Sequence, residues 1–67
     1  MELSARNQLK GKVKTVKLGS VMAEVIIEVA GQEMVSEISK ASAERLKLAA
    51  GDAVTGIIKS TEVMIGK

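Results

Sequence analysis

Hydrophobic and polar positions alternate through the first half of the chain with a period of two, which is typical of half-buried β-strands. The first such stretch is Leu9–Leu18, with apolar residues on one face and three lysines on the other. Its apolar positions move out of phase between Val13 and Val16, so we expect a bulge or bend near Thr15. The pattern therefore predicts a long, kinked first strand.

A second strand is predicted over Val21–Ala30, where apolar residues occupy every odd position, and a third over Glu33–Ser39. The other face of the second strand carries two glutamates but also Met22 and Ile26, so it is half apolar. One interpretation is a strand partly covered by a loop, and the other is a contact between subunits. We favour the subunit contact, because a chain this small buries little surface when alone.

The hydrophobic period changes over Ser39–Leu48, a stretch rich in good helix formers. We expect one short helix there, with Ser39 or Ser42 as its N-cap. Gly51 is the expected end of the helix.

Two further strands are predicted, over Ala53–Lys59 and over Glu62–Ile65. Five short strands with one small helix between the third and the fourth is the connectivity of an OB-type barrel. The sequence therefore predicts an all-β class with one short helix, a five-stranded OB-like barrel that forms one domain over residues 1–67 and is oligomeric.

The composition supports oligomerisation and argues against an enzyme. The chain has 67 residues and contains no Cys, no His and no aromatic residue. A domain of this size is marginal as a monomer, and it lacks the residues for disulfides and for the common metal sites. Triads of the Ser-His or Cys-His type are impossible. We therefore expect an oligomeric protein with no catalytic residues and no cofactor.

Charge and hydropathy restrict the partners. The formal net charge of +2 is too small to indicate nucleic acid or a membrane by itself. No apolar run approaches the roughly 20 residues of a membrane span, and we see no secretory leader, so an intracellular protein fits. Lys10, Lys12 and Lys14 allow a nucleic-acid interpretation, although no aromatic residues interleave with them. A solvated strand face explains the same three lysines.

Hydrogen-bond donors and cations gather in three short segments that contain no carboxylate: Ser4–Gln8, Ser39–Ser42 and Lys59–Thr61. Arginine offers a planar fork of donors, lysine a compact charge and serine a neutral hydroxyl. If the segments meet, they form an oxyanion site, and the lack of carboxylates argues against a site for a bare metal cation. Each segment also has a local explanation as a strand entry, a helix cap or a polar turn. The residues alone leave both interpretations open.

Two stretches of the sequence resemble the molbindin (Mop) family. The opening stretch reads Ser-Ala-Arg-Asn-Gln-Leu-Lys-Gly-Lys-Val from Ser4 to Val13. The closing stretch reads Gly-Asp-Ala-Val from Gly51 and then Ile-Lys-Ser-Thr-Glu-Val-Met-Ile from Ile58. Together they frame nearly the whole chain. The resemblance implies a single TOBE-type domain with an OB-like fold that binds molybdate, and also tungstate, in the bacterial cytoplasm.

The resemblance also implies an assembly and a set of ligands. The assembly is a homohexamer, a trimer of dimers, that binds oxyanions between subunits and serves molybdenum storage and homeostasis. The ligands are the Ser and Arg of the opening motif, hydroxyls at the start of the short helix and the Lys-Ser of the closing motif. In this sequence they are Ser4, Arg6, Ser39, Ser42, Lys59 and Ser60.

Two alternatives from other classes stay beside this hypothesis. One is a small nucleic-acid-binding OB-fold module that uses the lysine face of the first strand. The other is an anion-sensing dimerisation module of a regulator or transporter, which would require flanking domains that we do not expect here.

Overall fold

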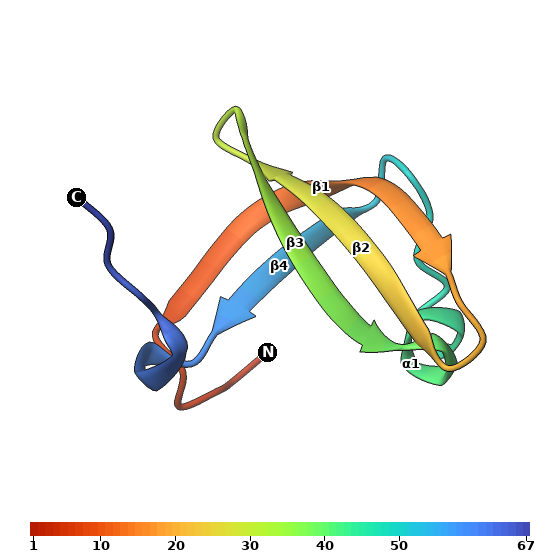
Figure 1. Ribbon diagram of the computed structural model, residues 1–67, viewed down its shortest axis with the longest axis horizontal. Coiled ribbons are helices and arrows are strands. Elements are labelled where there is room, and N and C mark those ends of the chain that lie inside the picture. The colour runs from red at the N-terminus through yellow and green to blue at the C-terminus, as the bar shows by residue number, and fades with distance from the viewer.

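The structure is a computed structural model that describes residues 1–67 (Figure 1). Its elements are β1 (Asn7–Leu18), β2 (Met22–Val29), β3 (Gln32–Ser39), α1 (Lys40–Arg45), β4 (Ala53–Ile58) and a 3-10 turn, η1 (Ser60–Glu62). The four strands form one antiparallel sheet in the order β3-β2-β1-β4. The predicted class, mainly β with one short helix, is confirmed.

β1 contains the bulge that the sequence predicts. Val13 pairs with Ile27 and Thr15 pairs with Ile26, which leaves Lys14 as the extra residue. The first half of β1 pairs with β4 and the second half pairs with β2. The bent strand β1 therefore belongs to both halves of the curled sheet and connects the β4 side to the β2 side (Figure 1).

Gly11 lies where the two halves of the sheet meet. A Cβ atom at this position would lie 2.9 Å from Cγ2 of Val29 and closer still to the carbonyl oxygen of Glu28. A side chain would therefore push β2 away from β1. Glycine at this position allows the two backbones to approach closely.

The core is small. Five residues are buried: Val13, Ala23, Val25, Ile27 and Ala43. Three of them are odd positions of β2, as the alternation predicts. Many apolar side chains remain at the surface, including Met22, which is 47% exposed. This limited burial agrees with the expectation that one chain alone is marginal.

α1 begins where predicted but ends earlier. Ser39 is the N-cap, and its hydroxyl oxygen accepts a hydrogen bond from the amide of Ser42 at 3.0 Å. The helix ends at Arg45, and Lys47 adopts a left-handed φ of 52°. No helix in this fold combines the length and the apolar character needed to span a membrane.

The prediction that Gly51 ends the helix is wrong. The chain leaves the helix early because Leu48 turns back to pack against the core, and its amide donates to the carbonyl of Ala43 at 3.2 Å. Gly51 lies in the next turn, with a φ of 94°, and its amide donates to the carbonyl of Val13 at 2.8 Å. Its left-handed backbone thus starts β4 rather than capping α1.

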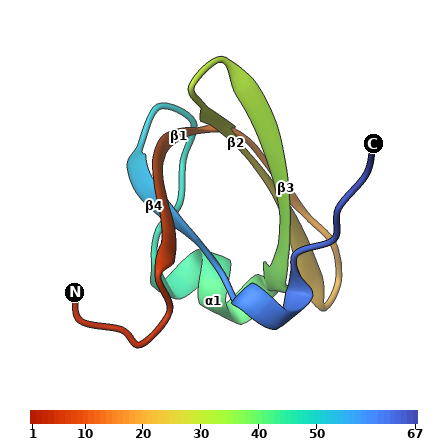
Figure 2. The same ribbon diagram turned by 90° about the vertical axis from the view of Figure 1, so that its left-hand side faces the viewer.

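The predicted fifth strand over Glu62–Ile65 is absent from the single chain. The amides of Glu62 and Val63 donate to the carbonyls three residues earlier, at 2.9 and 3.4 Å, and wind the chain into η1. The C-terminal tail, Val63–Lys67, therefore leaves β4 instead of folding back along it (Figure 1). Without a strand between them, the outer edges of β3 and β4 stay unpaired, and the sheet curls without closing into a barrel (Figure 2).

Candidate functional site

The first and last of the three donor segments meet at one end of the sheet. Asn7 in β1 pairs with Ile58 in β4, so the residues before Asn7 lie beside the residues after Ile58. A hollow of about 260 Å³ forms there, lined by Ser4, Ala5, Arg6, Asn7, Lys59 and Ser60. We call it the Arg6–Lys59 site. Four of the six predicted anion ligands lie in it.

Local hydrogen bonds fix the backbone on both sides of this site. The amide of Gln8 donates to the carbonyl of Arg6 at 3.1 Å, and its side-chain Nε2 donates to the carbonyl of Ala5 at 2.6 Å. On the other side, the amide of Glu62 donates to the carbonyl of Lys59 at 2.9 Å. Strand pairing and two tight turns therefore hold the backbone from which the two cations project.

The Arg6–Lys59 site contains two cations and no carboxylate. The only ion pair in the structure joins Lys14 and Glu33, which are not part of this site. Neither the guanidinium of Arg6 nor the ammonium of Lys59 donates a hydrogen bond to a protein acceptor. Unpaired cations beside neutral hydroxyls suit an anion with several oxygen acceptors.

The site is open on one side. Ser4, Arg6, Lys59 and Ser60 are exposed, and Asn7 is half-buried. Charge-assisted hydrogen bonds gain strength when water is excluded, because the effective dielectric constant falls. In a single chain the Arg6–Lys59 site is therefore an open hollow rather than an enclosed pocket.

Ser39 and Ser42 lie elsewhere. Ser39 pairs with Met22 at the start of β2, and α1 follows it directly. In Figure 1, α1 and η1 lie at opposite ends of the molecule. Within a single chain the middle donor segment therefore does not meet the other two, because the length of β1 separates them.

The hydroxyls at the start of α1 are partly used within the helix. Besides its capping role, the Ser39 hydroxyl donates to Oγ of Ser42 at 2.8 Å. The Ser42 hydroxyl accepts this bond and a longer one of 3.5 Å from Arg45. Ser42 thereby keeps its own proton free to donate, whereas the Ser39 proton already has an acceptor.

Asn7 is a lining residue that the predicted ligand set omits. It belongs to the same polar segment as Ser4 and Arg6, and its amide nitrogen is a donor. Its place next to Arg6 in that segment is the sequence signal that could have identified it. In the structure Asn7 is the first residue of β1 and pairs with Ile58 at the end of β4.

Two of the three lysines on the lysine face of β1 lie beside glutamates, whereas Lys10 pairs with Thr55. Lys12 lies opposite Glu28 in the β1–β2 register, and Lys14 forms an ion pair with Glu33. The hydrogen bond to Glu33, with the charge of that carboxylate, raises the pKa of Lys14 above its ordinary value. A basic stripe flanked by carboxylates is a poor footprint for a polyanion.

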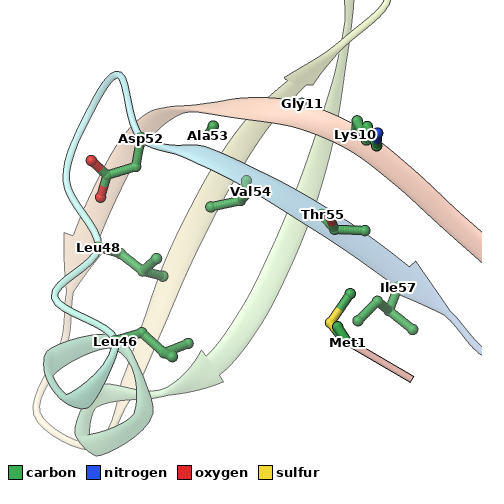
Figure 3. A pocket seen from close by; sticks show the side chains of 10 residues that line it. All are labelled: Met1, Lys10, Gly11, Leu46, Leu48, Asp52, Ala53, Val54, Thr55 and Ile57. Atoms are coloured by element: carbon green, nitrogen blue, oxygen red, sulfur yellow. The ribbon is translucent and has the colours of Figure 1, made fainter. Parts of the chain in front are cut away.

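The largest hollow follows β4 and the loop after α1 (Figure 3). Its volume is about 800 Å³, and most of its lining is apolar, including Leu46, Leu48, Val54 and Ile57. The carboxylate of Asp52 in this hollow already accepts a hydrogen bond from the amide of Ala49 at 2.9 Å. This groove offers apolar contact area rather than a cluster of reactive groups.

Comparison with known proteins identifies the family. The TOBE domain family matches residues 3–65. Molybdenum-pterin-binding protein 3 of Clostridium pasteurianum is 54% identical over 97% of each chain. A molybdate-binding protein from Sporomusa ovata has a similar structure, with a TM-score of 0.94, 39% identity and full coverage of both chains. The cytoplasmic molybdate-binding protein ModG, in a form with molybdate bound, gives a TM-score of 0.83 at 39% identity, covering 90% of this chain and 43% of ModG. These matches confirm the family resemblance seen in the sequence: the chain belongs to the TOBE domain family.

Proposed function

We propose that the protein binds molybdate, and tungstate with it, and that it stores or buffers molybdenum in the cytoplasm without catalysing a reaction. The observation that carries this proposal is the Arg6–Lys59 site, where two unpaired cations and two serine hydroxyls line one hollow that has no carboxylate. Relatives similar over the whole chain support it, since one is named a molybdenum-pterin-binding protein and another a molybdate-binding protein. ModG, described as cytoplasmic, supports the location.

The chemistry of the site matches a tetrahedral dianion. Arg6 supplies a fork of donors, Lys59 a point charge, and Ser4 and Ser60 neutral donors. A charge-assisted hydrogen bond contributes about 1.5–3 kcal/mol. A few such bonds give micromolar affinity or better after the cost of association is subtracted. We expect no cofactor and no bare metal ion.

The open side of the site leaves room for a second subunit to complete it. We propose a homohexamer, a trimer of dimers, in which the anion lies between chains. The Ser42 hydroxyl of a neighbouring copy completes the donor set, and Ser39 orients it through the hydrogen bond between the two hydroxyls. Bringing several Arg6 and Lys59 side chains together costs electrostatic repulsion, which a bound dianion cancels. Binding and assembly therefore stabilise each other by mass action.

The donor set also predicts selectivity. Phosphate carries a proton near neutral pH and needs an acceptor, which a site made of donors does not provide. Sulfate has the right charge but is smaller, so its hydrogen bonds to donors spaced for molybdate would be long. Molybdate and tungstate are close in size and charge, so we expect the site to hold both.

Isothermal titration calorimetry with molybdate, tungstate, sulfate and phosphate tests the proposal. We expect micromolar or tighter binding of molybdate and tungstate, and at least about tenfold weaker binding of the other two, equal to about 1.4 kcal/mol. Absence of heat with molybdate, together with a salt-sensitive complex with DNA or RNA, would support the nucleic-acid alternative instead. Equal binding of sulfate would contradict the proposed selectivity.

A further inference from the structure

The opening segment, residues 1–6, is hydrogen-bonded to the rest of the chain through a single residue. The pairing of β1 with β4 begins only at Asn7, so the segment lies outside the sheet. Both of its hydrogen bonds come from Gln8. The backbone amide of Gln8 donates to the carbonyl of Arg6 at 3.1 Å, and the side-chain Nε2 donates to the carbonyl of Ala5 at 2.6 Å. Gln8 therefore holds the whole segment, which carries two of the proposed anion ligands.

The side-chain bond fixes the peptide between Ala5 and Arg6. Every peptide bond in the chain is trans, so the carbonyl of Ala5 and the amide of Arg6 point in opposite directions. By holding the carbonyl, Gln8 also sets the direction of this amide, which donates no hydrogen bond within the chain. Ala5 lines the Arg6–Lys59 site, and the bond from Gln8 occupies a carbonyl oxygen that would otherwise repel an anion.

We propose that Gln8 is a positioning residue for the anion site, whose side-chain amide holds the Ala5–Arg6 peptide and so orients Arg6 toward a bound oxyanion. This inference rests on the molybdate binding proposed above and adds a residue that does not line the site. Arginine needs such support more than lysine does, because its planar fork of donors has to match the positions of the oxygen atoms. A donor that is held in place before binding avoids the cost of ordering it when the anion arrives.

The place of Gln8 in β1 suits this role. Its backbone pairs with Ile57 of β4, and this pairing does not depend on the Gln8 side chain. The sheet thus provides a fixed base, from which the side chain reaches back three residues along the chain. The other wall has its own support, since Lys59 directly follows β4 and its carbonyl accepts a hydrogen bond from the amide of Glu62 at 2.9 Å.

Gln8→Met removes the side-chain donor, adds no charge and keeps a side chain of similar length. Gln32→Met is the matched control, because Gln32 is also exposed and begins β3, a strand that contributes nothing to the site. In calorimetric titrations we expect Gln8→Met to weaken molybdate binding about three- to tenfold, the range for one lost hydrogen bond between neutral groups. Gln32→Met should bind like the parent. Equal affinity of Gln8→Met and the parent would overturn the positioning role.

A double-mutant cycle distinguishes positioning of Arg6 from a general structural effect. If Gln8 acts through Arg6, the two substitutions are not additive. In an Arg6→Ala background, Gln8→Met should therefore weaken molybdate binding by less than about twofold. The same factor in both backgrounds would contradict the proposal, because Gln8 would then support binding independently of Arg6.

Backbone ¹⁵N relaxation of the protein without anion gives a test that does not depend on binding. The amide of Arg6 should have an order parameter near 0.85 in the parent, as in a rigid backbone, and below about 0.6 in Gln8→Met. The amide of Lys59 is the internal control and should not change. An Arg6 order parameter that is equal in parent and variant would overturn the positioning role. A parent that binds no molybdate, while the order of Arg6 still depends on Gln8, would contradict the proposed function and support only the hold on Arg6.

Discussion

Replacement of Arg6 by alanine removes one of the two cations of the proposed anion site without disturbing the fold. Arg6 precedes β1, its side chain is exposed, and its guanidinium makes no hydrogen bond or ion pair within the chain. Surface substitutions of this kind change the free energy of unfolding by less than about 0.5 kcal/mol. A change in molybdate binding would therefore report on the site itself.

The expected loss follows from the contacts that Arg6 can make. One charge-assisted hydrogen bond contributes about 1.5–3 kcal/mol, and each 1.4 kcal/mol is a tenfold change in the dissociation constant. Arg6→Ala should therefore weaken molybdate binding by about 10- to 150-fold. Arg6→Lys should fall between the parent and the alanine variant, because it keeps the charge but loses the planar fork of donors.

Calorimetric titration of molybdate into parent and variants at one fixed salt concentration measures this effect. Lys17→Ala is a matched control, since it removes one exposed positive charge from the far half of β1. It should change the affinity little, because salt screens exposed charges over about 10 Å. An Arg6→Ala protein that binds molybdate as tightly as the parent would remove Arg6 from the site and refute the argument from unpaired cations.

The remaining predictions concern other charges and the backbone. Lys59→Ala should cut molybdate affinity sharply, whereas a triple change of Lys10, Lys12 and Lys14 to Gln should lower that affinity little. The reverse order, together with a salt-sensitive DNA or RNA complex that disappears in the triple variant, would support nucleic-acid binding. Gly11→Ala should lower the free energy of unfolding by about 1–3 kcal/mol in a urea titration, because its Cβ would collide with β2, and an unchanged midpoint would contradict that contact. The raised pKa of Lys14 means that its ion pair stabilises the fold below the ordinary lysine pKa and that this contribution is lost as the pH rises through the raised value. The stability difference between the parent and Lys14→Gln should therefore shrink in alkaline urea titrations, and a constant difference would contradict the pairing.

Most of the fold follows from local pattern. The alternation in β2 predicts its inward face. The change of phase between Val13 and Val16 predicts a bulge near Thr15, and the structure has it at Lys14. Both are local consequences of a two-residue period against one buried face, so a single sequence is enough to find them.

The errors occur where the outcome depends on partners rather than on pattern. Glu62–Ile65 has the composition of a strand, but a strand needs a neighbouring strand to pair with. In the single chain the start of this segment forms the local hydrogen bonds of η1 instead. Gly51 resembles a helix C-cap, yet packing of Leu48 against the core ends the helix several residues earlier. In both cases contacts distant in the sequence decide the local structure.

For the candidate site, too, one part follows from the sequence and another part depends on contacts distant in the sequence. The pairing of β1 with β4 brings Ser4 and Arg6 beside Lys59 and Ser60, as expected if the two ends of the chain meet. The start of α1 lies at the other end of the sheet, and no local pattern in the sequence could show that separation (Figure 1). Ser42 can therefore reach the Arg6–Lys59 site only from another copy of the chain.

Native mass spectrometry of the parent protein with and without molybdate tests anion binding and assembly together, because it counts chains and anions in the same particle. We expect assemblies of several 7.0 kDa chains that retain bound molybdate, and a larger assembled fraction when molybdate is present. A spectrum of 7.0 kDa monomers without retained anion, unchanged by added molybdate, would contradict both the binding site and its location between subunits.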